Sequence, residues 1–395
     1  MPTFSNHKQI YDRGYLNNLL NNGNGDKSIL KKISSIQVLS IFFLSIGLLN
    51  HVILIPFLLS AGGRDAWFFA ALTIGLIPIW VYLLSRIIKN MNNETLAAWL
   101  ENKFGKPIKN IVLFFTMIYL ISLILATTKE TMDWITTSFL FETPSLAIIL
   151  PFALLCIFMA HSGLRSIAIS SSVLLPIVVI LGLFVATGNI PKKDYSHLLP
   201  LFENGYFHGT RAFLYSSYGF AELILLAFFQ EKLSDTLSRK GLALLCLGLL
   251  FLLIGPLTAA IAEFGPILAE AMRYPAYEQW RLLTIGKYIE HTDFFSIYQW
   301  LAGAYIRVSL ALFLITENFK GKSNNMKLGI LFAIGFLMVI ISIVPFSNFK
   351  FLHISQNYYY PGTFYFLLLL TAFLFIGTFI HSKEGKKHEN ETIQK

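Results

Sequence analysis

The sequence of 395 residues has little charge: only 13% of its residues are Asp, Glu, Lys or Arg, against 55% hydrophobic residues. A soluble protein of this length needs more polar surface, so the composition excludes one. The two cysteines, Cys156 and Cys246, lie in apolar runs, which excludes a disulfide framework and indicates no metal or redox site. Phosphate-loop, His-Glu-x-x-His and Gly-x-Ser-x-Gly motifs are also missing, so we expect neither catalysis nor a cofactor.

Long apolar runs recur along almost the whole chain. Runs of roughly 18 to 25 residues suffice to cross about 30 Å of hydrocarbon, so these runs predict an all-α polytopic membrane protein without a soluble domain. Charges and turn residues bound ten predicted transmembrane helices, at residues 34–60, 65–87, 108–133, 144–161, 164–187, 207–230, 240–263, 292–316, 326–346 and 357–381.

The excess of 31 Lys and Arg over 22 Asp and Glu is interpreted as a topology signal and not as a nucleic-acid surface, because the cations lie in short segments between apolar runs. Most of them lie on the side of the termini, which predicts flexible cytoplasmic tails at 1–32 and 382–395 around a transmembrane domain at 33–381. We also expect a short helix near 93–101 on the inner surface and an outer cap near 267–290.

Ten spans can form two repeats of five with inverted topology, at 33–187 and 205–381. Polar residues and glycines interrupt the first span of each half, at Gly47, Asn50 and His51 in one and at Ser216, Ser217, Tyr218 and Gly219 in the other. Such breaks leave backbone groups unpaired, which hydrocarbon does not tolerate unless they line a cavity or bind a ligand. The alternative is that small residues only allow close helix packing.

Glu222 and Arg307 lie inside predicted spans, where an ionisable group costs about 2.5–3.5 kcal/mol unless it faces a partner or water. Their spans run in the same direction and both residues lie at similar depth, so we predict that they pair. The pair has three readings: a purely structural ion pair, a fixed cation at Arg307 in place of bound sodium, or a Glu222 carboxylate that takes up a proton.

Other polar and aromatic side chains inside the spans are candidates for a ligand pocket: Thr116, Tyr119 and Tyr305. Packing is the alternative for each of them. His51 is either a proton-sensitive switch or a hydrogen-bonded structural residue. The run at 358–362, Tyr-Tyr-Tyr-Pro-Gly, is interpreted as an interfacial belt and helix entry.

Several segments resemble one known family: Ile33-Ser-Ser-Ile-Gln37 at the start of the first span, Gly47-Leu-Leu with Pro56 after it, and Gly63-Arg-Asp-Ala-Trp67 before the second. They are similar to the endospore germination permease family, the B subunits of spore nutrient-germinant receptors, within the amino acid/polyamine/organocation superfamily. The resemblance extends over essentially the whole chain. It implies a ten-helix inverted-repeat fold with broken helices 1 and 6, in the inner membrane of the spore.

The same resemblance implies a role for the interrupted spans. Gly47, Asn50 and His51 match the place where superfamily members unwind the first span around a ligand, and residues 216–219 match the facing wall in the sixth. It also implies two partners, a membrane-embedded A subunit and a C subunit that is a lipoprotein.

We therefore expect a subunit that binds a small nutrient germinant, such as an amino acid, and signals through these partners. A proton- or sodium-coupled amino acid transporter is the main alternative, and a scaffold without a ligand is the third. The sequence does not identify the nutrient, because one or two pocket side chains decide it.

Overall fold

The computed structural model describes residues 32–203, 205–207, 209–284, 291–319, 321, 323–344 and 347–380. Its described elements are all helical, and a single parallel bridge joins Ile33 to Leu233. Nine helices in this part of the chain are long and apolar enough to cross a membrane. The predicted C-terminal tail and all of the predicted N-terminal tail except Lys32 lie outside the described residues.

The first predicted span consists of three consecutive helical pieces: α2 (Ser35–Leu48), a π-helical segment η1 (Leu49–Ile53) and α3 (Ile55–Gly62). A capping box between Ser34 and Gln37 begins α2, since each side chain accepts a hydrogen bond from the other residue's backbone N–H. The interruption predicted around Gly47 to His51 is therefore present, as a change of helix type.

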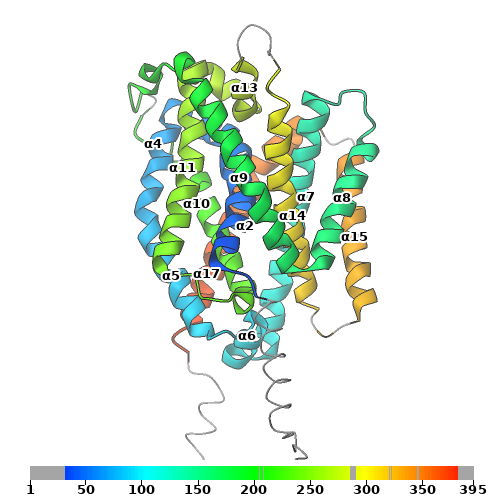
Figure 1. Ribbon diagram of the computed structural model, residues 1–395. Coiled ribbons are helices and arrows are strands. Elements are labelled where there is room, and N and C mark those ends of the chain that lie inside the picture. The colour runs from blue at the N-terminus through cyan, green and yellow to red at the C-terminus, as the bar shows by residue number, and fades with distance from the viewer. Residues whose placement is uncertain are drawn as a thin grey trace, which may run out of the picture.

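The chain leaves α3 through Gly63, whose φ of +51° is costly for any residue with a Cβ. The next span is again built from three pieces, after a short turn η2 (Gly63–Asp65). They are α4 (Ala66–Leu72), η3 (Thr73–Leu76) and α5 (Ile77–Met91). Figure 1 shows α4 near one end of the bundle and α5 near the other, next to α6 (Leu96–Phe104).

The sixth predicted span, at 207–230, is broken, but not at residues 216–219, where the sequence predicts the break: these residues lie within an α-helix, and the change of helix type comes at Glu222. The α-helix α10 (Thr210–Ala221) changes at Glu222 into a 3₁₀-helix, η6 (Glu222–Phe228), and a further turn, η7 (Gln230–Lys232), follows. Neither α10 nor η6 alone reaches the length of a membrane span. Within α10 the hydroxyls of Ser216 and Ser217 bond to carbonyls four residues earlier, a pattern that bends helices.

The remaining long helices agree with the predicted spans to within a few residues at most ends; the last begins nine residues before its predicted start at 357. They are α7 (Lys106–Ser138), α8 (Ser145–Ser162), α9 (Leu164–Gly188), α11 (Arg239–Phe264), α14 (Phe295–Glu317), α15 (Asn324–Ile343) and the continuous run of α16 (Asn348–Ile354), η8 (Ser355–Tyr359) and α17 (Tyr360–Gly377). Two short turns, η4 (Ile190–Lys192) and η5 (Tyr195–Leu198), follow α9.

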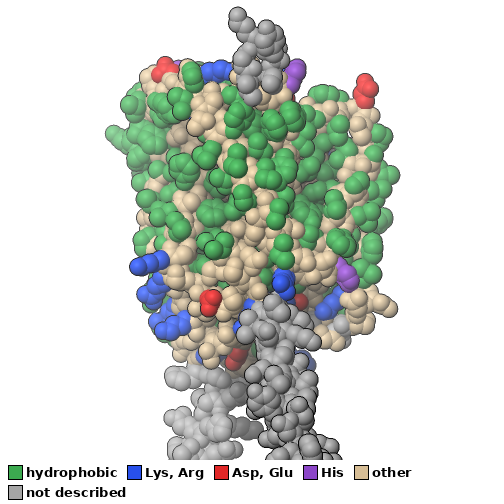
Figure 2. All heavy atoms as spheres, in the orientation of Figure 1, with side chains coloured by type: hydrophobic (Ala, Val, Ile, Leu, Met, Phe, Trp, Pro, Cys, Tyr) green, Lys and Arg blue, Asp and Glu red, His purple; other side chains and the backbone are tan. Residues whose placement is uncertain are grey.

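The two ends of the bundle differ (Figures 1 and 2). The predicted surface helix near 93–101 is present as α6, which Thr95 caps, and it lies at the end where the described chain starts and stops. The predicted cap is present at the opposite end as α12 (Pro266–Ala271) and α13 (Pro275–Leu282), while residues 285–290 lie outside the described part. A hydrophobic band separates the ends, and Lys and Arg gather toward the α6 end.

The helices α2 and α14 form the centre of the bundle. In α14, 83% of the most apolar stretch is buried, against 17% in α9, which faces outward. Gly303 permits the contact, because a Cβ there would lie 2.7 Å from Leu48 Cβ and 3.1 Å from the carbonyl oxygen of Leu44. Arg307, one turn further along α14, is thereby held close to α2.

Candidate functional site

Glu222 and Arg307 form a bidentate ion pair in the centre of the bundle. Arg307 Nη1 donates to Glu222 Oε2 and Nη2 donates to Oε1, each at 2.6 Å. Their side chains are 3% and 1% exposed for Arg307 and Glu222, respectively. The contact predicted from the sequence is confirmed, and the first residue of η6 is fixed to the middle of α14.

Three further groups complete the surroundings of the pair. The Tyr119 hydroxyl donates to Glu222 Oε1 at 3.1 Å, and Arg307 Nε donates to Thr127 Oγ1 at 3.2 Å. Arg307 Nη1 also donates to the carbonyl oxygen of Ser45 at 3.2 Å. A buried charge needs such hydrogen bonds as well as a counter-ion, so α2, α7, η6 and α14 all contribute to one polar centre.

The interruptions of the two predicted repeats meet beside this centre. Asn50 in η1 donates from Nδ2 to the Leu249 carbonyl at 3.2 Å, and a Cβ on Gly219 would lie only 2.1 Å from Asn50 Oδ1. Only glycine fits at position 219 with Asn50 in this place. Asn50 is fully buried, and no described residue donates a hydrogen bond to its Oδ1.

Tyr218 lies next to these groups and is fully buried. Its ring packs against that of Tyr360 with a centroid distance of 5.6 Å, and its hydroxyl lies within electrostatic range of Glu222 and Tyr119. The hydroxyls of Tyr119 and Tyr359 lie close enough to interact with the Tyr218 hydroxyl, although no described residue meets strict hydrogen-bond geometry with it. Near the ion pair, the buried carboxamide oxygen of Asn50 therefore lacks a partner among the described residues, and such atoms often mark a place for a ligand or water.

The other predicted site residues make contacts away from the ion pair. The hydroxyls of Thr116, Ser216 and Ser217 bond to carbonyls four residues earlier in their own helices. In the first span, His51 Nδ1 contacts the Leu252 carbonyl at 3.3 Å, and a Cβ on Gly47 would lie 3.3 Å from Leu252.

Tyr305 faces α8 and α9, near Cys156 and Ser170. Ligand contacts stay predictions for Tyr305 and for the five residues of the preceding paragraph: Gly47, His51, Thr116, Ser216 and Ser217.

Thr127 and Tyr360 lie at the site, but the sequence did not predict a place for either of them there. Thr127 lies two turns after Tyr119 on the same face of α7, so that spacing was available as a signal, but hydroxyl residues are common in this helix. Tyr360 is only 3% exposed and packs against Phe57 at 5.0 Å, so its assignment to an interfacial belt is wrong. Tyr358, which is 67% exposed, fits that assignment.

A second ion pair joins the cap at the α13 end of the bundle to α7. Glu130, three residues after Thr127 on α7, accepts a hydrogen bond from Arg273 in the turn between α12 and α13. Arg273 also stacks over the Tyr274 ring at 4.6 Å. Burial opposes its charge, but Glu130 and Tyr274 outweigh that effect and raise the pKa of Arg273 above its ordinary value. The cap therefore carries a permanent cation that faces α7.

Comparison with known proteins identifies the family. A family described as spore germination protein, a spore permease, matches residues 32–351. The chain belongs to this family. Spore germination protein XB of Bacillus anthracis is 37% identical over 351 residues, which cover 87% of this chain and 98% of that protein. The many apolar helices agree with an integral membrane member of the spore permease family.

The ion pair predicts a non-additive response to mutation. Glu222→Gln or Arg307→Met alone is expected to lower the free energy of unfolding by about 3–5 kcal/mol, because each leaves a buried group without its partner. The double variant is expected to lose less than either single variant. Denaturant unfolding in detergent micelles measures the free energy of unfolding of all three variants. Lys109→Gln, which breaks an exposed pair with Glu101, is the control, and its expected loss is under about 1 kcal/mol. Additive losses would contradict the pairing.

Gly219→Ala is expected to destabilise the protein by about 1–3 kcal/mol, because its Cβ overlaps Asn50. Gly255→Ala in α11 is the matched control, since no atom of the described residues lies within 4 Å of a Cβ there. The control is expected to be neutral or to stabilise by about 0.5–1 kcal/mol. Adding Asn50→Ala to Gly219→Ala should restore part of the loss. Equal unfolding midpoints for the two glycine variants would show that Asn50 does not occupy this place.

Proposed function

We propose that this chain is the nutrient-sensing subunit of a spore germinant receptor, and that it binds a small nutrient where η1 meets α10. The observation that carries the proposal is the contact of Asn50 with Gly219 beside the buried Glu222 and Arg307 pair. Irregular backbone inside a membrane protein is tolerated where it lines a binding site. Membership of the spore germination protein family supports the proposed role in spore germination.

The proposed architecture has ten spans in two inverted repeats, at 33–187 and 205–381, with α10 and η6 together as the sixth span. The first span of each repeat then carries the irregular segment, η1 in one and η6 in the other. In this arrangement the two irregular segments face each other across the middle of the membrane, as the repeat symmetry requires.

The proposed ligand is an amino acid, a zwitterion that needs acceptors for its ammonium group and a cation for its carboxylate. Among the described residues, Asn50 Oδ1 is a buried acceptor without a partner, and Tyr218 adds a hydroxyl beside it. Arg307 is the cation at the same site, and it would exchange Glu222 for the carboxylate of the ligand. The side chains around the pair are almost completely buried, so the structure corresponds to a closed state in which a ligand enters only after the bundle opens.

We propose entry from the α13 end. A cavity of about 200 Å³ lies there between α3, the turn that carries Arg273, and α16, and Glu270 and Ser60 also line it. Release of Arg273 from Glu130 would open the way to Thr127 and the ion pair. A nutrient shifts this equilibrium only if it binds the open and closed states with different affinity.

The proposed orientation has the α6 end and both termini in the cytoplasm, in the inner membrane of the spore. The gathering of Lys and Arg at the α6 end supports it by the positive-inside rule. The proposed partners are the A subunit in the membrane and the C subunit, a lipoprotein, through which binding triggers germination.

A proton- or sodium-coupled amino acid transporter is the alternative function. Both carboxylate oxygens of Glu222 already accept hydrogen bonds from Arg307, which leaves this group poorly suited to bind a proton or sodium ion. In the closed state the buried pair therefore favours a sensor, and no catalytic role is proposed.

Retention of labelled amino acids in vesicles that contain the purified chain distinguishes these functions. With an imposed proton or sodium gradient and a panel of amino acids, we expect one of them to saturate near one molecule per chain. Gly219→Ala should abolish this retention, and Gly255→Ala should preserve it. Accumulation far above one per chain would identify a transporter. No retention, with or without the partner subunits, would refute the proposed site.

Arg273→Gln should accelerate both binding and release of the retained amino acid about tenfold, the effect of about 1.4 kcal/mol of lost barrier. The reason is that Glu130 loses the cation that joins α7 to the cap. Arg281→Gln, which breaks an exposed pair with Glu278 on the same cap, is the matched control. Rapid-filtration kinetics measure both variants. Equal rates would exclude Arg273 as the entry barrier.

A further inference from the structure

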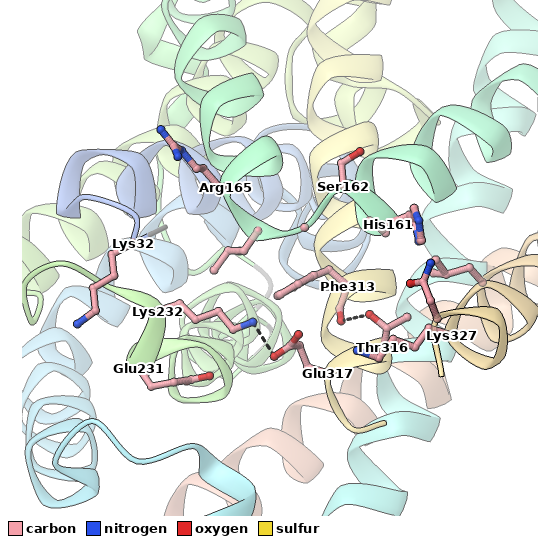
Figure 3. Close-up of a pocket in the computed structure, with 15 residues that line it drawn as sticks. Lys32, His161, Ser162, Arg165, Glu231, Lys232, Phe313, Thr316, Glu317 and Lys327 are labelled. Atoms are coloured by element: carbon pink, nitrogen blue, oxygen red, sulfur yellow. Dashed lines mark hydrogen bonds and ion pairs between the residues drawn. The ribbon is translucent and has the colours of Figure 1, made fainter. Parts of the chain in front are cut away.

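A larger cavity lies at the α6 end, away from the proposed nutrient site (Figure 3). Its volume is about 540 Å³, and it lies between the elbow of α8 and α9, the end of α14, the start of α15 and η7. The side chains that line it include several cations: Lys32, Arg165, Lys232 and Lys327.

The cavity carries an excess of positive charge. Lys232 is paired with Glu317 at 2.6 Å and lies over the Phe313 ring at 4.7 Å. Within the described part of the chain, no ion pair involves Lys32, Arg165 or Lys327, although all three line the cavity. Glu231 also lines it and has an interaction of its own. The arrangement therefore favours an anion.

The lining is also partly apolar and continues onto the outer surface of the bundle. Ala160, Leu164 and Leu331 contribute to the wall. Four residues before Ser162, Phe158 on α8 is 66% exposed, and Phe332, next to Leu331 on α15, is 50% exposed. Exposed aromatic side chains on membrane-length helices face acyl chains, so the cavity adjoins the lipid surface.

We propose that this cavity binds the phosphate headgroup of an anionic phospholipid, with its acyl chains against Phe158 and Phe332. Arg165 lies at the rim and points away from the centre of the cavity in Figure 3, and rotation of its exposed side chain would bring its planar guanidinium onto the phosphate in a bidentate manner. Lys32 and Lys327 supply further cations. Basic pockets between transmembrane helices on the positively charged side of a protein bind such headgroups.

A lipid in this place joins the two elements that carry the central ion pair. Glu317 and Phe313 lie on α14 after Arg307, and Lys232 lies in η7, which follows the helix that begins with Glu222. Occupancy therefore stabilises the α6 end of both elements. This inference does not depend on the proposed nutrient site.

Native mass spectrometry of the purified chain tests the proposal, with phosphatidylglycerol or phosphatidylcholine added at equal concentration. The native chain is expected to retain phosphatidylglycerol preferentially and to unfold at a higher temperature with it. Arg165→Gln with Lys327→Gln should reduce bound phosphatidylglycerol roughly tenfold or more, since each cation near a lipid surface contributes about 1 kcal/mol.

The matched control is Lys89→Gln with Lys240→Gln, which removes two exposed cations from the same end of the bundle outside the cavity. This control should bind as much phosphatidylglycerol as the native chain. Arg165→Lys should bind more of it than Arg165→Gln. If the double variant does not fold, the single variants Arg165→Gln and Lys327→Gln decide the question. Equal losses in cavity and control variants, or no lipid preference, would refute the site. Inorganic phosphate that displaces phosphatidylglycerol and stabilises the chain in phosphatidylcholine would show a free-anion site and overturn the lipid assignment.

Discussion

A guanidinium and a carboxylate that are both sealed from water must remain paired, and this requirement determines the centre of the molecule. Arg307 and Glu222 are held by two hydrogen bonds of 2.6 Å, and α2 and α7 supply the remaining acceptor and donor groups. Gly303 lets α14 approach α2 closely enough for this arrangement. Movement of any one of these elements would expose or separate the charges, so the pair couples four elements that are distant in sequence.

The physical chemistry of the bilayer explains why much of the fold was predictable. Predominantly apolar runs of sufficient length cross hydrocarbon, and charges and turns mark their limits, so most span boundaries followed from the sequence. The pairing of Glu222 with Arg307 was predictable for the same reason, because a charge at that depth needs a partner and the depth of each residue follows from its position in its span.

The rest depended on contacts that a single sequence does not encode locally. The change from α- to 3₁₀-helix at Glu222 has no marker, and Tyr360 resembles an interfacial tyrosine until Phe57 and Tyr218 are seen to cover it. Arg273 lies in an outer segment, where its pairing with Glu130 depends on how the cap folds back over α7. Thr127 was one of many hydroxyl residues in α7, and only the position of Arg307 selects it.

These contacts form one line through the protein, from Arg273 at the cap, through Glu130 and Thr127 on α7, to the ion pair and the junction of Asn50 with Gly219. Cryo-electron microscopy of the chain with the amino acid it retains tests the proposed site most directly. We expect ligand density against Asn50 and Tyr218, beside a displaced or rearranged Glu222 and Arg307 pair. Ligand density confined to another part of the chain, with this centre unchanged, would contradict it.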